Sequence, residues 1–148
     1  MKNLTLLLCI FCSILNFASA QQITGTWKRT SIVLEKSDGT KSDMFQSQLK
    51  TMPCAATITY TYAPGGQVTM NAGGCSNMKN MLEAMNGKTT WTQTGNKITI
   101  NSGDENFPIQ IYNVSFEGGA MIWLFDYASN PKTPNPTHVK SMKIVYKR

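Results

Sequence analysis

The stretch ITGTWKRTSIVLEK occupies residues 23–36 and places a glycine, Gly25, two positions before a tryptophan, Trp27. A buried tryptophan normally needs an acceptor for its ring N–H. A glycine beside it permits a close backbone approach or an unusual turn. The β-branched and alternating residues that follow are typical of a strand. The stretch therefore predicts a fixed corner, built around Trp27, where a first strand begins.

Short, alternating runs rich in threonine and aromatic residues continue along the rest of the chain. This pattern is typical of strands, and turn signals containing glycine or asparagine separate most of the runs. The runs predict eight strands, over 23–35, 54–62, 66–73, 88–94, 96–101, 107–117, 119–127 and 138–147. Short strands joined by tight turns favour an all-β fold, either a sandwich or an up-and-down barrel.

Two segments interrupt the strands with helical spacing. Residues 43–52 predict a short helix, and residues 76–87 predict a clearer one, with Ser76 or Asn77 as its cap and Asn86-Gly87 at its end. Its methionines have two interpretations, as Cu(I) ligands or as adaptable apolar filler over an opening. The second is favoured because no histidine lies nearby. The expected lid residues are Met78, Met81 and Met85.

The first twenty residues have the regions of a secretory signal peptide. Lys2 is followed by an apolar run over 4–17 and by Ala18-Ser19-Ala20, a cleavage site before Gln21. A membrane anchor is the alternative, but the run is short for a bilayer span of about 20 residues. A lipoprotein is disfavoured because no lipobox surrounds the cysteines of this segment. The prediction is a signal peptide over 1–20 and one exported domain over 21–148.

Removal of the signal peptide leaves two cysteines, Cys54 and Cys75. In an oxidising compartment a single disulfide between them is expected. This pairing differs by one residue from the register that aligns the apolar positions of the same predicted hairpin. Both hold only if one strand carries an extra residue. A β-bulge is therefore expected at Gly73-Gly74.

The residues of catalytic sites are sparse. His138 is the only histidine and has no fixed partner, so neither a triad nor a zinc site is predicted. Asp126 stands in a predicted strand, where strand parity favours an outward carboxylate over an inward one with a raised pKa. No phosphate-binding loop or metalloprotease helix is present. We expect no catalytic residue, no metal, no cofactor and no enzymatic activity.

The domain over 21–148 carries 13 Lys and Arg residues against 8 Asp and Glu residues. The basic residues are scattered, so nucleic acid is not an expected partner. In a closed barrel the first and last strands are neighbours, which would bring several of them onto adjoining strands. This set is either a solvated surface, the favoured interpretation, or a docking patch for anions. It comprises Lys28, Arg29, Lys140, Lys143, Lys147 and Arg148.

Taken together, these motifs resemble the lipocalin and calycin pattern, and above all small bacterial exported lipocalin-like domains. The shared features are Gly25-Thr26-Trp27, a cysteine on either side of a glycine-containing hairpin, a later Thr90-Trp91, and Tyr146-Lys147-Arg148 at the end of the last strand. The resemblance spans nearly all of 23–148. It implies an eight-stranded antiparallel up-and-down barrel with one or two short helices. In that family the tryptophan plugs the closed end and a basic side chain, here Arg148 or Lys147, lies across it.

The resemblance and the apolar residues together predict a ligand-binding interior. The leading hypothesis is an exported, periplasmic or secreted bacterial protein that holds a small apolar or amphipathic molecule. The alternative is a scaffold whose loops or basic patch bind another protein or an anionic envelope polymer. Polar groups for a ligand are expected from Tyr60, Tyr62, Tyr112 and Asp126. The predicted lining comprises Ile58, Tyr60, Val68, Met70, Trp91, Ile98, Ile109, Ile111, Trp123 and Phe125.

Overall fold

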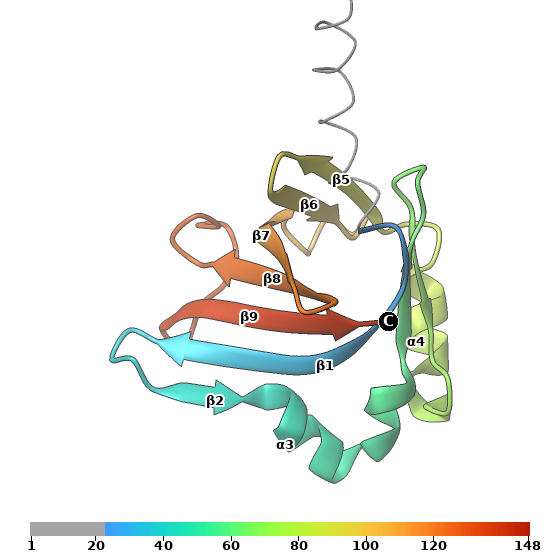
Figure 1. Cartoon of the computed structure of the whole chain (residues 1–148), viewed down its shortest axis with the longest axis horizontal. Helices are drawn as coiled ribbons and strands as arrows, with labels where there is room; N and C mark the ends of the chain where they lie inside the picture. The colour runs from blue at the N-terminus through green and yellow to red at the C-terminus, as the bar shows by residue number, and fades with distance from the viewer. Residues whose placement is uncertain (1–22) are drawn as a thin grey trace, which may run out of the picture.

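A computed structural model of the chain describes residues 23–148, so the predicted signal peptide lies outside the described residues. This part is mostly β-structure with two short α-helices (Figure 1). Its strands are β1 (Gly25–Lys36), β2 (Lys41–Asp43), β3 (Thr59–Tyr62), β4 (Val68–Asn71), β5 (Thr90–Thr94), β6 (Lys97–Asn101), β7 (Gln110–Glu117), β8 (Ala120–Asp126) and β9 (Val139–Lys147). Its helices are α3 (Met44–Thr51), α4 (Lys79–Met85) and the 3-10 helices η1 (Pro53–Thr57) and η2 (Ser76–Met78).

Eight of the strands form an antiparallel up-and-down barrel. They pair in the order β4-β3-β1-β9-β8-β7-β6-β5, while β2 pairs with the far end of β1. In Figure 1 the long strands β1, β9 and β8 lie side by side. The two ends of this order meet at a bridge between Gln67 and Thr90, beside a hydrogen bond of 3.0 Å from Val68 N to Thr89 O. The barrel is therefore nearly closed, which confirms the predicted fold class.

Helix α4 stands beside β4 where strand pairing stops (Figure 1). The side chain of its C-terminal cap, Asn86, forms hydrogen bonds with the β4 backbone on the side away from β3, where no strand of residues 23–148 pairs with it. Asn86 Oδ1 accepts from Met70 N at 2.7 Å, and Asn86 Nδ2 donates to Met70 O at 3.0 Å. These bonds satisfy backbone groups that an unpaired strand edge would leave open. Helix α4 and its cap therefore complete the barrel wall beside the end of β4, where no described strand does so.

The two ends of the barrel differ in their connections. Tight turns join β3 to β4, β5 to β6 and β7 to β8 at one end, which also carries Trp27 and the C-terminus. We call it the plugged end. At the opposite, open end the connections span 37–58, 72–89, 102–109 and 127–138, and they include α3 and α4. Long connections on a rigid scaffold are the usual place for binding residues.

The predicted second strand over 54–62 begins only at Thr59, because η1 precedes it. Pro53 lies in the first turn of η1, where its fixed φ is favourable and its missing N–H costs nothing. Thr57 Oγ1 then donates to Cys54 O at 2.8 Å. The predicted Cys54–Cys75 disulfide is confirmed, and it joins residues that lie outside the β3–β4 ladder.

The bulge predicted at Gly73-Gly74 is wrong. The β3–β4 ladder is unbroken, with Tyr60 opposite Met70, and β4 ends at Asn71. The register that aligns the apolar positions of the predicted hairpin would place Tyr60 opposite Val68. The observed register differs from it by two residues, so the same side chains still face inward. Asn71 Oδ1 accepts from Gly73 N at 2.8 Å and turns the chain. The cysteines therefore meet beyond the ladder and place no constraint on its register.

The helices differ from expectation in detail. α3 matches the segment 43–52 and is capped by Asp43, whose Oδ1 accepts from Gln46 N at 3.0 Å. α4 begins after η2, and its cap is Met78 without a side-chain hydrogen bond, so the predicted caps Ser76 and Asn77 are wrong. The three-residue strand β2 was not predicted, because a run so short has no detectable alternation.

Candidate functional site

The corner at Trp27 is built as a plug. Trp27 is buried, and its Nε1–H donates to Ile23 O at 2.8 Å. The Arg148 guanidinium carbon lies 4.5 Å from the centroid of the Trp27 ring, and Arg148 Nη2 donates to Thr24 O at 3.2 Å. Gly25 has a φ of +119°, which only glycine adopts readily. The structure thus places Arg148, and not Lys147, across the tryptophan.

Above this plug the interior is filled by aromatic rings around Trp123. The Trp123 ring centroid lies 5.4 Å from that of Tyr62, 5.1 Å from that of Tyr112 and 5.4 Å from that of Tyr146. Burial raises the pKa of Tyr146 to about 12 and raises the pKa of Tyr62 and Tyr112 as well. These phenols are therefore neutral near pH 7.

Arg29 also points into the barrel. Its strand position lies opposite the buried Tyr146, and its guanidinium carbon lies 5.4 Å from the Phe45 ring centroid and 5.5 Å from that of Tyr60. The expectation that Arg29 joins a basic surface patch is wrong. The signal was available in the sequence, because Arg29 follows Trp27 by two residues and alternate residues of a strand share a face.

Within residues 23–148, Arg29 has no ion pair. The carboxylates on β1 and β2 have other partners: Glu35 pairs with Lys41 at 3.4 Å and with Lys140 at 3.6 Å, and Asp43 caps α3. The Nε atom of Arg29 is buried and finds no protein acceptor. The residue as a whole remains partly exposed, so that exposure belongs to its other atoms.

Trp123 supplies a second unmatched donor to the same interior. The residue is 3% exposed, and its Nε1 atom finds no protein acceptor among the described residues. Its ring and the side chain of Arg29 are neighbours of the same residue, Tyr146. Buried N–H groups without acceptors are uncommon in folded proteins. The interior therefore contains two N–H donors, Arg29 Nε and Trp123 Nε1, that no described residue matches.

The interior is filled unevenly along the barrel axis. Val68 and Ile98, near the turns of the plugged end, are buried. Inward-facing residues further along the same and neighbouring strands remain partly exposed. These are Met70, Ile100, Gln110 and Met142. The barrel's own side chains therefore pack the plugged end and leave the open end incompletely filled.

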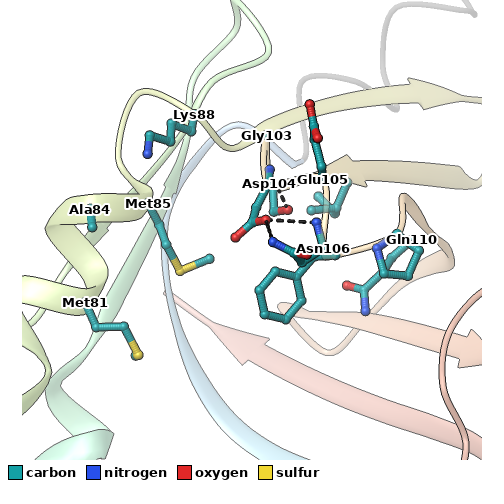
Figure 2. A pocket seen from close by; sticks show the side chains of 13 residues that line it. Met81, Ala84, Met85, Lys88, Gly103, Asp104, Glu105, Asn106 and Gln110 are labelled. Atoms are coloured by element: carbon teal, nitrogen blue, oxygen red, sulfur yellow. Dashed lines mark hydrogen bonds between the residues drawn. The ribbon is translucent and has the colours of Figure 1, made fainter.

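A pocket with a volume of about 730 Å³ lies at the open end, between α4 and the β6–β7 connection. In Figure 2, Met81 and Met85 extend from α4 toward the loop that carries Asp104 and Asn106. The loop is braced by Asp104 Oδ1, which accepts from Asn106 N at 2.9 Å and from Asn106 Nδ2 at 3.0 Å. Ile100 and Gln110 form the wall on the barrel side.

Gln110 connects this pocket with the aromatic interior. The Tyr112 hydroxyl donates to Gln110 Oε1 at 2.8 Å, so one side of Gln110 lines the pocket while its amide oxygen holds an interior phenol. The rim carries exposed apolar side chains, with Met81 51% and Phe107 65% exposed. The arrangement is an apolar opening whose barrel-side wall is joined to the aromatic interior through Gln110.

Most of the predicted lining residues face the interior. Ile58, Val68, Trp91, Ile98, Trp123 and Phe125 are buried there, and Tyr60 and Met70 pack against the same core while remaining partly exposed. The predicted inward positions of Ile111 and Ile109 are wrong. Ile111 lies on the outer face of β7 and is 39% exposed, and Ile109, just before β7, is 56% exposed. Their neighbours Gln110 and Tyr112 take the inner positions, because successive residues of a strand point to opposite faces.

Asp126 and the predicted lid residues have different surroundings. Asp126 faces outward, as parity favours, and its carboxylate accepts from Ala128 N and Ser129 Oγ, each at 3.0 Å. On α4, Leu82 is the buried residue, while Met78 packs against the core and Met81 faces the pocket. Leu82 shares the predicted apolar face of the helix with the methionines, and its spacing alone does not distinguish it from them as the anchor.

The basic patch is smaller than expected. Arg29 points inward and Lys140 pairs with Glu35, so outward lysines on β1 and β9 remain. Lys28 and Lys147 stand directly opposite each other across the β1–β9 ladder. Like charges so placed repel each other unless an anion lies between them.

No protein-family model, curated protein or solved structure matches this chain. Across residues 23–148, no helix has both the length and the apolar character needed to cross a membrane. The same residues contain no group of three or more His, Cys, Asp or Glu side chains arranged to hold a metal ion.

Proposed function

We propose that the chain is an exported lipocalin-like binding protein that holds a small apolar or amphipathic molecule in the open end of its barrel. The observation that carries this proposal is the uneven filling of the interior, which is packed around Trp27 but partly exposed toward α4. A pocket of about 730 Å³ adjoins the unfilled part. Pockets for small molecules are commonly about 300–1,000 Å³ and mostly apolar.

The apolar residues of α4 support the same function. Leu82 fixes the helix to the core, whereas Met81 and Met85 face the pocket. Methionine adapts its shape to irregular apolar partners, so these side chains suit the wall of a site that opens and closes around a ligand. The confirmed disulfide supports export, because such bonds persist in oxidising compartments.

Native mass spectrometry of the protein from its natural producer tests the proposal. The expected spectrum shows a reproducible excess over the mass of the oxidised chain, lost on denaturation and recovered in an organic extract. Ala84 lines the pocket, so Ala84→Trp should fill it and remove the excess mass. Asn80→Trp, on an exposed part of the same helix, is the matched control and should retain it. An empty wild-type protein that also binds no added amphiphile would refute the proposal.

A second candidate is a scaffold that binds an anionic polymer or protein through its outer face. The facing lysines Lys28 and Lys147 favour it, because their mutual repulsion would be relieved by a bound anion. The double substitution Lys28→Glu and Lys147→Glu should then abolish retention on a polyanion column at low salt. Unchanged retention would eliminate this surface.

A further inference from the structure

We infer that the molecule held in the barrel is an anionic amphiphile, whose carboxylate or similar singly charged group is received inside the barrel by Arg29. The inference rests on the proposed binding function and specifies the ligand's chemistry. Its starting point is a charged side chain in the interior that, among residues 23–148, has no acidic partner.

The Arg29 guanidinium is only partly matched, because its Nε is buried without an acceptor while other atoms of the side chain remain exposed. Burial of a cation costs free energy that a paired anion or several hydrogen bonds must offset. The rings of Phe45 and Tyr60 attract the Arg29 charge. Ring contacts of this type do not occupy the N–H groups as hydrogen-bond donors, and a guanidinium has five of them. Arg29 therefore retains donors for a planar anion such as a carboxylate.

Within residues 23–148, no acidic side chain is fully buried that could match this charge. The aromatic hydroxyls nearest in the fold belong to Tyr60, Tyr62, Tyr112 and Tyr146, and burial raises the pKa of all four. They stay protonated at neutral pH and remain dipoles. Trp123 adds a further unmatched N–H. An acceptor that enters this interior would thus meet donors from two sides and no negative charge.

The mouth of the barrel has the opposite character, and this sets the orientation of the ligand. Asp104 and Glu105 stand on the rim with Lys88 as the cation among the lining residues, while Met85 and Phe107 offer apolar surface. Figure 2 shows Asp104 and Glu105 on the loop that faces α4. An anionic group left at the rim would lie beside these carboxylates. The anion is therefore expected to face Arg29, with the apolar body directed toward α4.

The test compares three probes of equal chain length, dodecanoate, dodecanol and dodecylamine, on the full domain after removal of bound molecules. Binding is followed by tryptophan fluorescence and by calorimetry. A charge-assisted contact with Arg29 should make dodecanoate bind about 10- to 100-fold more tightly than dodecanol. Arg29→Met keeps an extended apolar side chain and removes the charge, so this preference should disappear while dodecanol still binds.

Lys97→Met is the matched control. It removes one positive charge from an exposed position on β6, outside both proposed binding surfaces, and should leave the preference for dodecanoate unchanged. Arg29→Lys, which keeps the charge without the planar fork, covers the case in which Arg29→Met does not fold. The preference should then fall but not vanish.

Each of the other outcomes refutes a specific part of the inference. Equal binding of dodecanoate and dodecanol by the wild type, or a preference that survives in Arg29→Met, would refute the role of Arg29 and leave the binding function intact. Tighter binding of dodecylamine would indicate that the rim carboxylates select the ligand. Failure of all three probes together with an empty native protein would refute the binding function itself.

Discussion

The disulfide should contribute about 3 kcal/mol to the stability of the domain. Cys54 and Cys75 are separated by 21 residues, and closing a loop of that length in the unfolded chain removes entropy worth about 3 kcal/mol at 25 °C. Reduction of the wild-type protein should lower its free energy of unfolding by this amount. The measurement is urea unfolding followed by circular dichroism, with and without a reductant, and with thiol titration to verify the redox state.

The double variant Cys54→Ala and Cys75→Ala separates the cross-link from the packing of its sulfur atoms. Cys75 is fully buried, so its replacement by alanine leaves a small cavity and should cost about 1 kcal/mol beyond reduction. The dependence on urea should also steepen, because the unfolded chain without a cross-link exposes more surface. A reduced protein with an unchanged midpoint would show that the chain-entropy argument fails here. A fall well above the expected sum would show that the bridge orders η1 and the approach to α4.

Two further predictions concern backbone geometry and buried phenols. Gly73→Ala should destabilise the fold by about 2 to 4 kcal/mol, because Gly73 has a φ of +56° and an added Cβ would lie 2.5 Å from Thr57 O. The control Gly118→Ala has a similar φ of +54° but open space around the added Cβ, so it should cost only about 1 kcal/mol in the same urea titration. Equal losses of stability in the two variants would refute the steric part of the argument. Burial raises the pKa of Tyr146 from 10.0 to about 12, so the unfolded chain loses this proton first, and the contribution of Tyr146 to stability should fall by about 2 kcal/mol as the pH rises from about 10 to about 12. Tyr146→Phe should reduce the alkaline fall by this amount, while Tyr60, Tyr62 and Tyr112 maintain the rest because burial raises their pKa as well; a variant profile parallel to that of the wild type would contradict the assignment.

The fold was predictable from the sequence because its signals are local and repeated. Alternation over the strands and glycine-containing turns identify eight β-segments and leave a sandwich or a barrel open, and the lipocalin-like resemblance implies the barrel. The resemblance also implies the contact between Trp27 and a terminal basic residue, which agrees with barrel closure because closure brings the first strand beside the last. None of these inferences depends on an exact register, which is why errors in register did not disturb them.

The details that failed depend on choices that local patterns leave open. At Ile111 and Tyr112 both residues favour strands, so the pattern alone does not show which side chain faces inward. The structure resolves the choice through Gln110, whose amide accepts the Tyr112 hydroxyl. The strand predicted from residue 54 was wrong for a different reason. Pro53 begins a 3-10 helix there, and alternation of apolar and polar residues does not reveal such a helix.

Asparagine side chains that bond to strand backbones were also missed. Asn130 Oδ1 accepts from Ile111 N at 2.8 Å and its Nδ2 donates to Ile111 O at 3.0 Å, much as Asn86 does at Met70. Asparagine between strands is ordinarily a turn signal. Its pairing with a distant strand is visible only once the strands are placed in space.

The two arginines Arg29 and Arg148 have different surroundings in this barrel. Arg148 lies over Trp27 and donates to a backbone carbonyl, so its charge and donors are used by the fold itself. Arg29, two residues after Trp27, has ring contacts but a buried Nε without an acceptor. A methionine or leucine there would fill the interior without the cost of burying a charge. Departures from such packing rules are expected where function requires them. The unpaired guanidinium, more than the volume of the pocket, is therefore the feature on which the proposed ligand chemistry rests.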